Sequence, residues 1–332
     1  MYILAEIGST HDGSLGIACN SVKAAAAVGS DGVKFQTHIA DAESIRDAPP
    51  PPFFDAEPRF DYFTRTGFSE PEWIAVRDSC KAAGVDFLSS PFSVEAVDLL
   101  ERVGVTKYKI PSGEVTNLPL IKRVVATGKP IFLSSGMSDW KELDLAVETA
   151  LQGASEVTLL QCTSKYPCPY EDVGLNVLTE FRERYGLPVG LSDHTNTNYA
   201  ALAAVTLGAV VIEKHFTLSQ NLYGSDAEHS IEPDVFRELV QGIRAIETML
   251  ATDVDKSDIE TFGEMKRVFE KSIVAALNIE AGALITREML AFKKPGTGMS
   301  PAELESVVGA QAARALPVDT LISKADLESP SQ

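Results

Sequence analysis

Two histidines in the second half of the chain, His194 and His215, stand where chemistry is expected. The chain reads PVGLSDHT around the first and GAVVIEKHFT around the second. A short apolar, β-branched run, Pro188–Leu191 or Ala209–Ile212, precedes each polar cluster that holds a histidine. The intervening Asn196–Leu207 is rich in alanine with helical spacing, so the stretch is predicted to be a strand–helix–strand unit with parallel strands.

Polar residues that follow the carboxyl ends of parallel strands line the site of an α/β fold. His194 and His215 hold that position on consecutive strands, so we expect them to face one another across a pocket. With Asp193, Glu213 and Lys214 beside them, two imidazoles are typical of a divalent-metal site or of acid–base chemistry. The alternative is that both histidines are structural residues at strand ends, with their hydrogen bonds satisfied and no role in chemistry.

The elements that must position these histidines are a series of strands, each followed by a helical segment. Six earlier strands are predicted at Tyr2–Ile7, Gly32–Thr37, Asp86–Ser90, Lys107–Ile110, Pro130–Ser134 and Val157–Thr163. Helices are predicted at Leu15–Val28, Ser93–Arg102, Leu118–Ala126, Trp140–Leu151, Leu175–Tyr185 and Arg237–Leu250. Eight strand–helix units in about 250 residues favour the α/β fold called the (β/α)8 TIM barrel. A doubly wound sheet is the alternative fold.

The predicted strand ends collect lysines, hydroxyls and glycines, a mixture suited to a phosphate or a carboxylate. Lys34 and Lys109 each lie between apolar neighbours within a strand, which is hard to explain for surface lysines. A lysine-based Schiff-base aldolase would use the same residues. There is no GxSxG elbow, no Walker loop and no GxGxxG fingerprint, so hydride transfer and P-loop chemistry are not expected.

Composition sets limits on partners and location. The formal net charge of the 332 residues is -18, which argues against nucleic-acid and anionic-membrane binding. The four cysteines show no CxxC pair or zinc spacing, so we interpret them as reduced thiols of a cytoplasmic protein. The N-terminus does not resemble a signal peptide, and no apolar run reaches the ~20 residues of a membrane span.

Two segments break the rhythm of strands and helices. Asp41–Pro71 contains PPPPFF and many aromatic residues with little helical period, and we interpret it as a long loop that forms a packed lid or an interface. After Leu250 the composition becomes polar and then short-stranded with Gly and Pro turns. The predicted domains are a barrel at 1–255, a linker at 256–270 and a small, mostly β domain at 271–332.

Motifs along the whole chain resemble the sialic acid synthases, which condense phosphoenolpyruvate with an N-acetylated hexosamine. AEIGSTHDG is similar to that family's opening, and VKFQT, SSPF, KIPSGEVTNLPL, SSGMS, CTSKYPCPYEDV, GLSDHT and IEKHFT follow in its order. The tail, KSIVAALNIEAGALIT and then KKPGTGMSP, resembles the family's C-terminal antifreeze-like (SAF) domain. The resemblance implies the TIM barrel with a SAF domain, and PSGEVTNLPL looks more like the sialic and legionaminic branch than the pseudaminic one.

The resemblance also implies roles for individual residues. His194 and His215 would hold a divalent metal, most commonly Mn²⁺, with Mg²⁺ or Co²⁺ possible in its place, and would share catalysis with Glu6 and Glu114. Phosphoenolpyruvate would be bound by Lys34, Ser90, Lys109, Ser112, Ser134, Ser164 and Ser192. The sugar would be bound by Glu6, Gln36, Tyr166, Asp226 and Lys294. The family's small domain reaches over the partner's barrel, so a domain-swapped homodimer is expected.

Departures from the family pattern cluster on the sugar side. Thr10 replaces an asparagine, Ser225 replaces a proline, Ala227 stands where histidine is common, and Lys294 replaces an arginine that meets the N-acetyl group. Lysine keeps the charge but loses the bidentate fork. We therefore expect the family's reaction with a sugar other than plain N-acetylmannosamine, and His229 as a possible substitute for the absent histidine. Another phosphoenolpyruvate or pyruvate aldol enzyme, or a non-catalytic carbohydrate-binding relative, are the alternatives.

Overall fold

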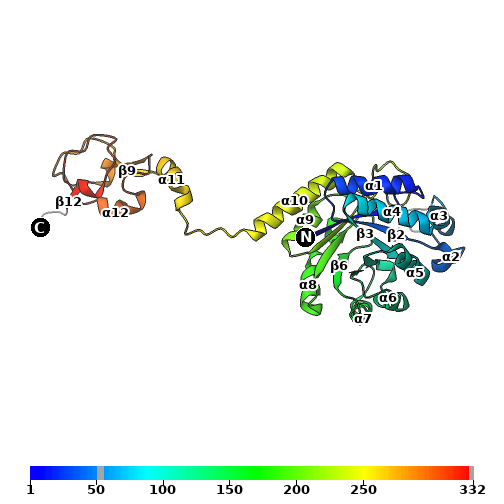
Figure 1. Ribbon diagram of the computed structural model, residues 1–332. Helices are drawn as coiled ribbons and strands as arrows, with labels where there is room; N and C mark the ends of the chain where they lie inside the picture. The colour runs from blue at the N-terminus through cyan, green and yellow to red at the C-terminus, as the bar shows by residue number, and fades with distance from the viewer. Residues whose placement is uncertain (51–55, 329–332) are drawn as a thin grey trace. The chain divides into compact units, whose positions relative to one another are not determined.

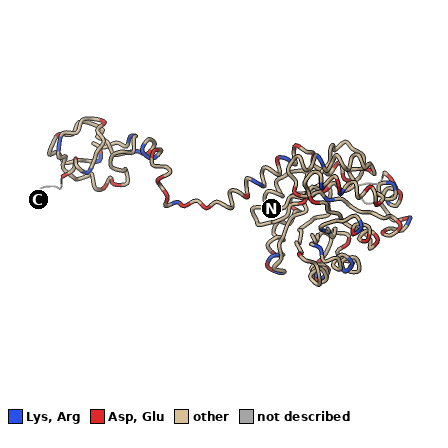
Figure 2. Tube along the Cα trace, in the orientation of Figure 1, with Lys and Arg blue, Asp and Glu red and all other residues tan. Residues whose placement is uncertain are grey.

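The computed structural model of the chain describes residues 1–50 and 56–328. The chain divides into two compact units, Met1–Thr252 and Asp253–Gln332. Each unit is described by itself below. Acidic residues are spread along both units rather than gathered in one segment (Figure 2).

The first unit is a closed barrel of eight parallel strands in sequence order, which confirms the predicted TIM barrel. Its strands are β1 Tyr2–Gly8, β2 Gly32–Thr37, β3 Asp86–Pro91, β4 Lys107–Ile110, β5 Ile131–Ser134, β6 Val157–Cys162, β7 Val189–Asp193 and β8 Val211–His215. Closure is made by β1 and β8, with Glu6 paired to His215. All eight carboxyl ends therefore meet at one mouth.

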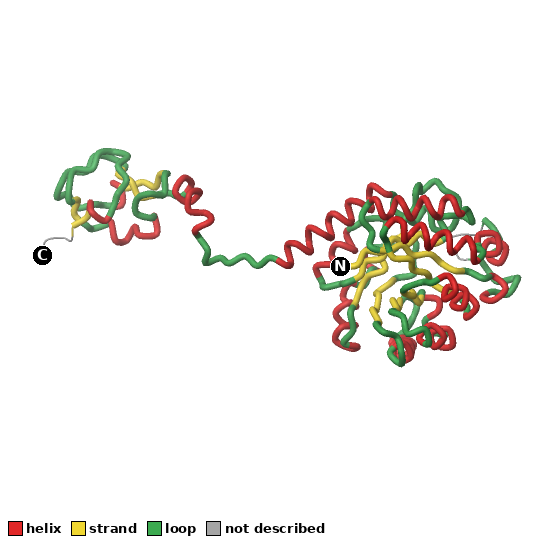
Figure 3. Tube along the Cα trace, in the orientation of Figure 1, coloured by secondary structure: helices red, strands yellow, loops and turns green. Residues whose placement is uncertain are grey.

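Helices surround the strands (Figures 1 and 3). They are α1 Leu15–Ala27, α2 Ala40–Glu43, α3 Arg59–Thr66, α4 Glu70–Ala83, α5 Val94–Val103, α6 Leu118–Val125, α7 Trp140–Ala150, α8 Leu175–Tyr185, α9 Tyr199–Thr206 and α10 Pro233–Ala251, with short 3₁₀ turns η1 Ser112–Glu114 and η2 Tyr170–Asp172. Helix α5 shows how the sequence sets such an element. Its N-cap Ser93 accepts a hydrogen bond from Ala96 N, Gly104 ends it with φ 92°, and one face is buried.

The interior of the barrel is layered. An apolar layer is formed by Leu4, Leu88, Phe132, Leu160 and Val211, all nearly or fully buried. Side chains alternate between the two faces of a strand, so the inward residues one step closer to the mouth lie two positions further along. These are Glu6, Ser90, Ser134, Cys162 and Glu213. The apolar layer closes the floor of the barrel, and the layer above it is polar.

Gly190 shows how tightly the floor is packed. A Cβ at this position would lie 2.5 Å from the Val211 carbonyl oxygen and 2.6 Å from Leu160 Cδ2. Only glycine lets β7 approach β8 this closely.

The segment 41–71 differs from its prediction. It was expected to be a loop with little helix, but it contains α2 and the eight-residue α3. Aromatic residues are weak helix formers, and this helix is too short to show a clear period. Phe60, Tyr62 and Phe68 are buried, which confirms the expected packing for these three side chains. Phe53 and Phe54 lie outside the described residues.

The second unit has its own core. Its elements are η3 Glu260–Phe262, α11 Gly263–Phe269, β9 Ser272–Ala275, η4 Arg287–Met289, β10 Leu290–Lys293, η5 Pro301–Glu303, α12 Leu304–Val307, β11 Gln311–Ala312, η6 Lys324–Asp326 and β12 Leu327–Glu328. Strands β9 and β10 pair antiparallel, as do β11 and β12, around buried residues such as Ile273, Leu316 and Ile322. Among the described helices of either unit, none is long and apolar enough to cross a membrane.

Candidate active site

A cavity of about 750 Å³ opens at the mouth of the barrel. Every strand contributes to it, either from its last residues or from the loop that follows. Twelve of the predicted site residues line it: Glu6, Lys34, Gln36, Lys109, Ser112, Ser134, Ser164, Tyr166, Ser192, His194, His215 and Asp226. The closed barrel therefore brings together side chains from the first and the last strand.

A buried ionic cluster forms one part of this cavity. Lys109 Nζ donates to both carboxylate oxygens of Glu213 at 2.8 Å, and Ser192 Oγ donates to Glu213 Oε1 at 2.9 Å. Lys34 Nζ lies 3.9 Å from the same carboxylate. Burial alone would raise the pKa of Glu213, but the Lys109 and Lys34 ammonium groups outweigh it and hold that pKa well below its ordinary value. Glu213 is therefore an anion that keeps two cations at the cavity.

Glu6 is the second carboxylate of the cluster and differs from Glu213. Its Oε1 accepts from Gln36 Nε2 at 2.9 Å, and its Oε2 lies 2.8 Å from Lys34 Nζ without hydrogen-bond geometry. Burial raises the pKa of Glu6, and the nearby Glu213 charge adds to this, although Lys34 opposes it. A carboxyl group with a raised pKa and an oxygen without a hydrogen bond can exchange a proton with a ligand.

The two histidines meet in the cavity as predicted. The ring centroids of His194 and His215 are 5.4 Å apart. His194 Nδ1 donates to the Thr163 carbonyl oxygen at 2.8 Å, which leaves the lone pair on Nε2, 3.3 Å from the Tyr166 hydroxyl. Burial lowers the pKa of His215 to about 3, so its ring is neutral, and its buried Nδ1 has no hydrogen-bond partner. Neutral imidazoles are the form that binds a metal.

These observations allow a test of whether a divalent metal fits. The two rings face one space. His215 is neutral and has an orphaned nitrogen, while His194 is oriented by a backbone carbonyl. Burial lowers the pKa of His194, but the Cys162 sulfur outweighs it and raises that pKa, so a metal ion would have to displace a proton from this ring. Within residues 1–50 and 56–328, no group of three or more His, Cys, Asp or Glu side chains is arranged around a common point for an ion. The protein would thus supply two imidazole ligands and leave the other positions to water and substrate, which is the open shell of a catalytic site.

Asp226 is fixed in place by the loop after β1. Its Oδ2 accepts from Ser9 N at 2.7 Å, and its Oδ1 accepts from Ser225 Oγ at 3.1 Å. Gly8, at φ 53°, leaves the room that this carboxylate occupies. Thr10, one of the departures from the family pattern, is buried, and its hydroxyl donates to the Ile7 carbonyl oxygen at 2.9 Å rather than lining the cavity.

Three predicted residues do not line the cavity. Ser90 is fully buried beneath it and accepts from Lys34 Nζ at 3.2 Å. Glu114 lies in η1 and accepts from Asn117 Nδ2 at 2.7 Å, and burial raises the pKa of its carboxyl group. Lys294 belongs to the second unit, where its ammonium lies 4.9 Å from the centre of the Phe269 ring. His229, to which a substitute role was given, has its ring 6.1 Å from that of Tyr166.

Several cavity residues had no role assigned from the sequence. Besides Glu213, they include Ser9, His38, Arg59, Phe63, Phe92 and Cys162. For Glu213 and Cys162 the signal was available, because each lies two positions before or after a predicted inward residue on its strand. The same spacing was available for His38, which lies two positions after the predicted Gln36. No local pattern indicates Arg59 and Phe63, from α3, or Phe92, from the loop after β3, because they meet the other residues only in the fold.

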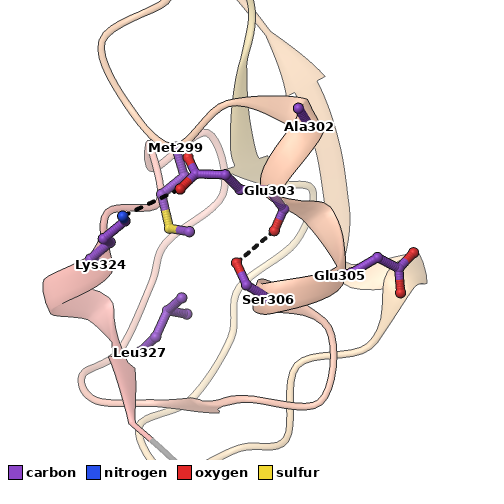
Figure 4. A pocket seen from close by; sticks show the side chains of 7 residues that line it. All are labelled: Met299, Ala302, Glu303, Glu305, Ser306, Lys324 and Leu327. Carbon is purple, nitrogen blue, oxygen red and sulfur yellow. Dashed lines mark hydrogen bonds and ion pairs between the residues drawn. The ribbon is translucent and has the colours of Figure 1, made fainter.

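A second hollow, of about 500 Å³, lies in the C-terminal unit (Figure 4). It is lined by Met299, Ala302, Glu303, Glu305, Ser306, Lys324 and Leu327. Lys324 and Glu303 face each other at 3.4 Å across its edge, while the Glu305 side chain points away. The Lys324 side chain is largely exposed, so this hollow lacks the buried charges of the barrel mouth. The barrel cavity is the candidate active site.

Comparison with known proteins agrees with this geometry. The chain is 34% identical to an N,N'-diacetyllegionaminic acid synthase of Legionella pneumophila, over 97% of this chain and 93% of that one. A spore coat polysaccharide biosynthesis protein of Bacillus subtilis superposes with a TM-score of 0.66 at 30% identity, covering 99% and 96% of the two chains. An N-acetylneuraminic acid synthetase of Leptospira borgpetersenii gives 0.70 at 27% identity, over 80% and 90%.

Family models match both units of the chain. The SAF domain matches residues 270–328, which confirms the predicted C-terminal domain type. The NeuB family matches residues 21–255, which cover most of the barrel and most of the cavity-lining strands. This protein, a TIM barrel followed by a SAF domain, therefore belongs to the NeuB family, whose relatives include sialic, legionaminic and pseudaminic acid synthases.

Proposed function

We propose that this protein condenses phosphoenolpyruvate with an N-acylated amino hexose and water, to give a nonulosonic acid and phosphate. The observation that carries the proposal is one cavity that joins Lys34, Lys109 and a ring of serines to the facing pair His194 and His215. The names of the synthase relatives support this reaction class. The C–O bond of phosphoenolpyruvate, rather than its P–O bond, would break.

Charge balance explains why the lysine–carboxylate cluster and the pair of histidines belong to one site. Lys34 and Lys109 are matched within the cluster by Glu6 and Glu213, so the cluster alone offers little net charge to a trianionic ligand. Binding such a ligand therefore calls for further positive charge beside the cluster. A divalent ion held by His194 and His215, expected to be Mn²⁺ with Mg²⁺ or Co²⁺ as alternatives, would supply it and polarise the sugar aldehyde.

The residues of the chain then divide the work. The two lysines, with Ser112, Ser134, Ser164 and Ser192 as donors, would bind the phosphate and carboxylate of phosphoenolpyruvate. C3 of the enol forms the new C–C bond with the sugar aldehyde carbon, whose oxygen gains a proton. Water then adds its oxygen to C2, and phosphate leaves with the bridging oxygen.

A carboxylate should accept the proton of that water. Glu6 lines the cavity with an oxygen that lacks a hydrogen bond, and Glu114 is adjacent to the cavity-lining Gly113. Both have raised pKa values caused mainly by burial. Separate Gln substitutions distinguish them, because the base should lose far more kcat than the other residue, by about 10²-fold or more.

The sugar would occupy the side of the cavity formed by Glu6, Gln36, Tyr166 and Asp226. The departures at Ser225, Ala227 and Lys294 favour a sugar other than plain N-acetylmannosamine, such as a diacetamido hexose. Ser225 lines this cavity and donates to Asp226, so the change bears directly on that side. Lys294 would reach the cavity from the partner in the expected domain-swapped homodimer, which size-exclusion chromatography with light scattering can test.

The deciding experiment is phosphate release from phosphoenolpyruvate, with and without N-acetylmannosamine or a diacetamido hexose, and with a chelator. The proposed synthase needs both the sugar and the metal. Release that resists chelator, with trapping by borohydride, would instead indicate a Schiff-base aldolase. No release with any sugar of the panel would leave a carbohydrate-binding relative as the better description.

A further inference from the structure

His38, directly after β2, occupies an unusual position at the wall of the cavity. Its ring is stacked between those of Phe63 and Phe92, with centroid distances of 3.7 and 4.1 Å and interplanar angles of 18° and 20°. The side chain is 7% exposed and lines the cavity beside Gln36. Two aromatic faces on opposite sides of an imidazole stabilise a positive charge on it.

The hydrogen bonds of His38 indicate that charge. Nδ1 lies 2.9 and 3.0 Å from the two carboxylate oxygens of Glu43, and Nε2 lies 3.1 Å from Gln36 Oε1. A carboxylate and an amide oxygen only accept hydrogen bonds, so both ring nitrogens must donate. Imidazole is a stronger base than a carboxylate, so the shared proton belongs on the ring rather than on Glu43.

The orientation of the Gln36 amide closes the argument. Gln36 Nε2 donates to Glu6 Oε1 at 2.9 Å, so its oxygen must face His38. A reversed amide would lose this hydrogen bond, because its oxygen would then face the Glu6 Oε1 acceptor at the same short distance. The acceptor oxygen of Glu6 and a proton on His38 Nε2 therefore favour the same orientation of the Gln36 amide from opposite ends.

Other charged and titratable groups around His38 are compatible with a cation there. Glu43, from α2, is its direct partner, and Glu114, from η1, lies near Glu43. Arg59, from α3, stacks on Phe63 with its guanidinium 5.0 Å from the ring centre and opposes the charge. His11, from the loop after β1, is nearby, but burial lowers its pKa to about 4, so it is neutral.

We propose that His38 is a doubly protonated imidazolium and a positioning residue, which fixes the donors and acceptors that Gln36 and Glu6 present to the sugar. The inference rests on the proposed function for the identity of the ligand, a neutral acylated amino sugar. Without the Nε2 proton, a lone pair would face Gln36 Oε1 and the amide would reverse. Sugar binding then weakens, while phosphoenolpyruvate, held by the lysines and serines, is unaffected.

The charge is tested by long-range ¹H–¹⁵N spectroscopy of histidine-labelled full-length protein with Mg²⁺ present. The His38 signals are assigned by their loss in His38→Gln. At neutral pH both His38 nitrogens should show the shifts of protonated nitrogen. His11 is the internal control, because its Nδ1 accepts from Gly13 N at 3.1 Å and its ring also lies against an aromatic neighbour, Phe68. His11 should show one unprotonated nitrogen, and the same pattern for His38 would overturn the proposal.

The positioning role is tested by calorimetry with Glu43→Gln, which removes the partner that holds the proton. Affinity for N-acetylmannosamine or a diacetamido hexose should fall by about 10-fold, as for loss of a hydrogen bond to a charged group. Phosphoenolpyruvate affinity should not change. The matched control is Glu70→Gln, which breaks a surface ion pair between Glu70 on α4 and Arg102 on α5 and should change neither affinity.

A pH series separates positioning from general damage to the fold. In the wild type, the midpoint at which sugar affinity falls should coincide with the midpoint at which His38 Nε2 loses its proton. A pH-independent sugar affinity, or an equal loss of both ligands in Glu43→Gln, would overturn the positioning role. If neither sugar binds the wild type, the proposed function fails, and the spectroscopy still decides the charge of His38.

Discussion

Glu213 and Lys214 are neighbours on β8, yet their environments differ in kind. Glu213 points into the barrel, where Lys109 donates to both of its oxygens and the cluster borders an open cavity. Lys214 points outward and donates to Asp193 Oδ2 at 2.7 Å, to the Thr197 carbonyl oxygen at 2.9 Å and to the Thr195 carbonyl oxygen. Both pairs are almost completely buried.

The difference teaches how to separate a binding charge from a structural one. Lys214 has three donors, and oxygens of the chain take all of them, so nothing remains for a ligand. The partners of Lys109 belong to one carboxylate, and its side chain also lines the cavity, so an anion can join it. Burial alone does not distinguish the two lysines, because the deciding features are saturation of the donors and access to the cavity.

The largest expected effect comes from replacing Lys109, the partner of Glu213 inside the barrel. If the proposed function holds, Lys109→Met should lower kcat/KM for phosphoenolpyruvate by about 10³-fold, because it removes the charge proposed to bind the phosphate and leaves Glu213 short of a partner. Phosphate release measures it. The double variant Lys109→Met/Glu213→Gln should recover stability but not activity, since it removes the unpaired charge without restoring the cation. Recovery of activity in the double variant would contradict the binding role.

The outward-facing pair of Lys214 and Asp193 should respond in the opposite way, with a loss of stability rather than of phosphoenolpyruvate binding. Lys214→Met leaves Asp193 as an unpaired buried charge and should lower the free energy of unfolding by about 3 kcal/mol. Denaturant unfolding measures it, with KM for phosphoenolpyruvate expected to stay unchanged in the folded protein. Glu70→Gln, on the surface, is the comparison and should cost less than about 1 kcal/mol. A stable Lys214→Met protein that no longer binds phosphoenolpyruvate would reverse our assignment.

The inward face of β8 also carries His215, which gives a prediction that needs no turnover. Mn²⁺ at 100 times its dissociation constant should stabilise the wild type by about 2.7 kcal/mol, because binding to the folded state alone shifts the equilibrium. Thermal unfolding with increasing Mn²⁺ measures it. A His194→Gln/His215→Gln variant should show no such shift, whereas an equal shift would place the ion elsewhere.

The smallest expected effect concerns the free energy of unfolding that the protein loses by burying the charged form of Glu6. The pKa of Glu6 is raised by burial, so folding disfavours its charged form, and stability is lost as pH rises above the ordinary value of 4.5. Glu6→Gln should therefore gain about 1 kcal/mol near neutral pH while losing activity. The gain should shrink as pH falls and vanish well below 4.5, where the wild-type group is protonated in both states. A gain independent of pH would rule out this origin.

Much of the fold could be predicted because its causes are local. Alternating and β-branched runs set the eight strands, and caps such as Ser93 and Gly104 set the helix ends. The same alternation placed Lys34, Lys109, His194 and His215 at the mouth. The prediction for 41–71 was wrong where a short aromatic helix, α3, depends on burial against the barrel rather than on its own propensity.

The partners of each side chain could not be predicted in this way. Glu213 and Lys109 are 104 positions apart in the sequence and meet only because the barrel closes. The Phe63–His38–Phe92 stack likewise joins α3 to the loops after β2 and β3. The sequence by itself determined which residues face the interior, since strand alternation is a short-range property. Only the tertiary structure decided which charged groups have all their hydrogen bonds within the chain and which can still bind a ligand, because that depends on contacts between distant strands.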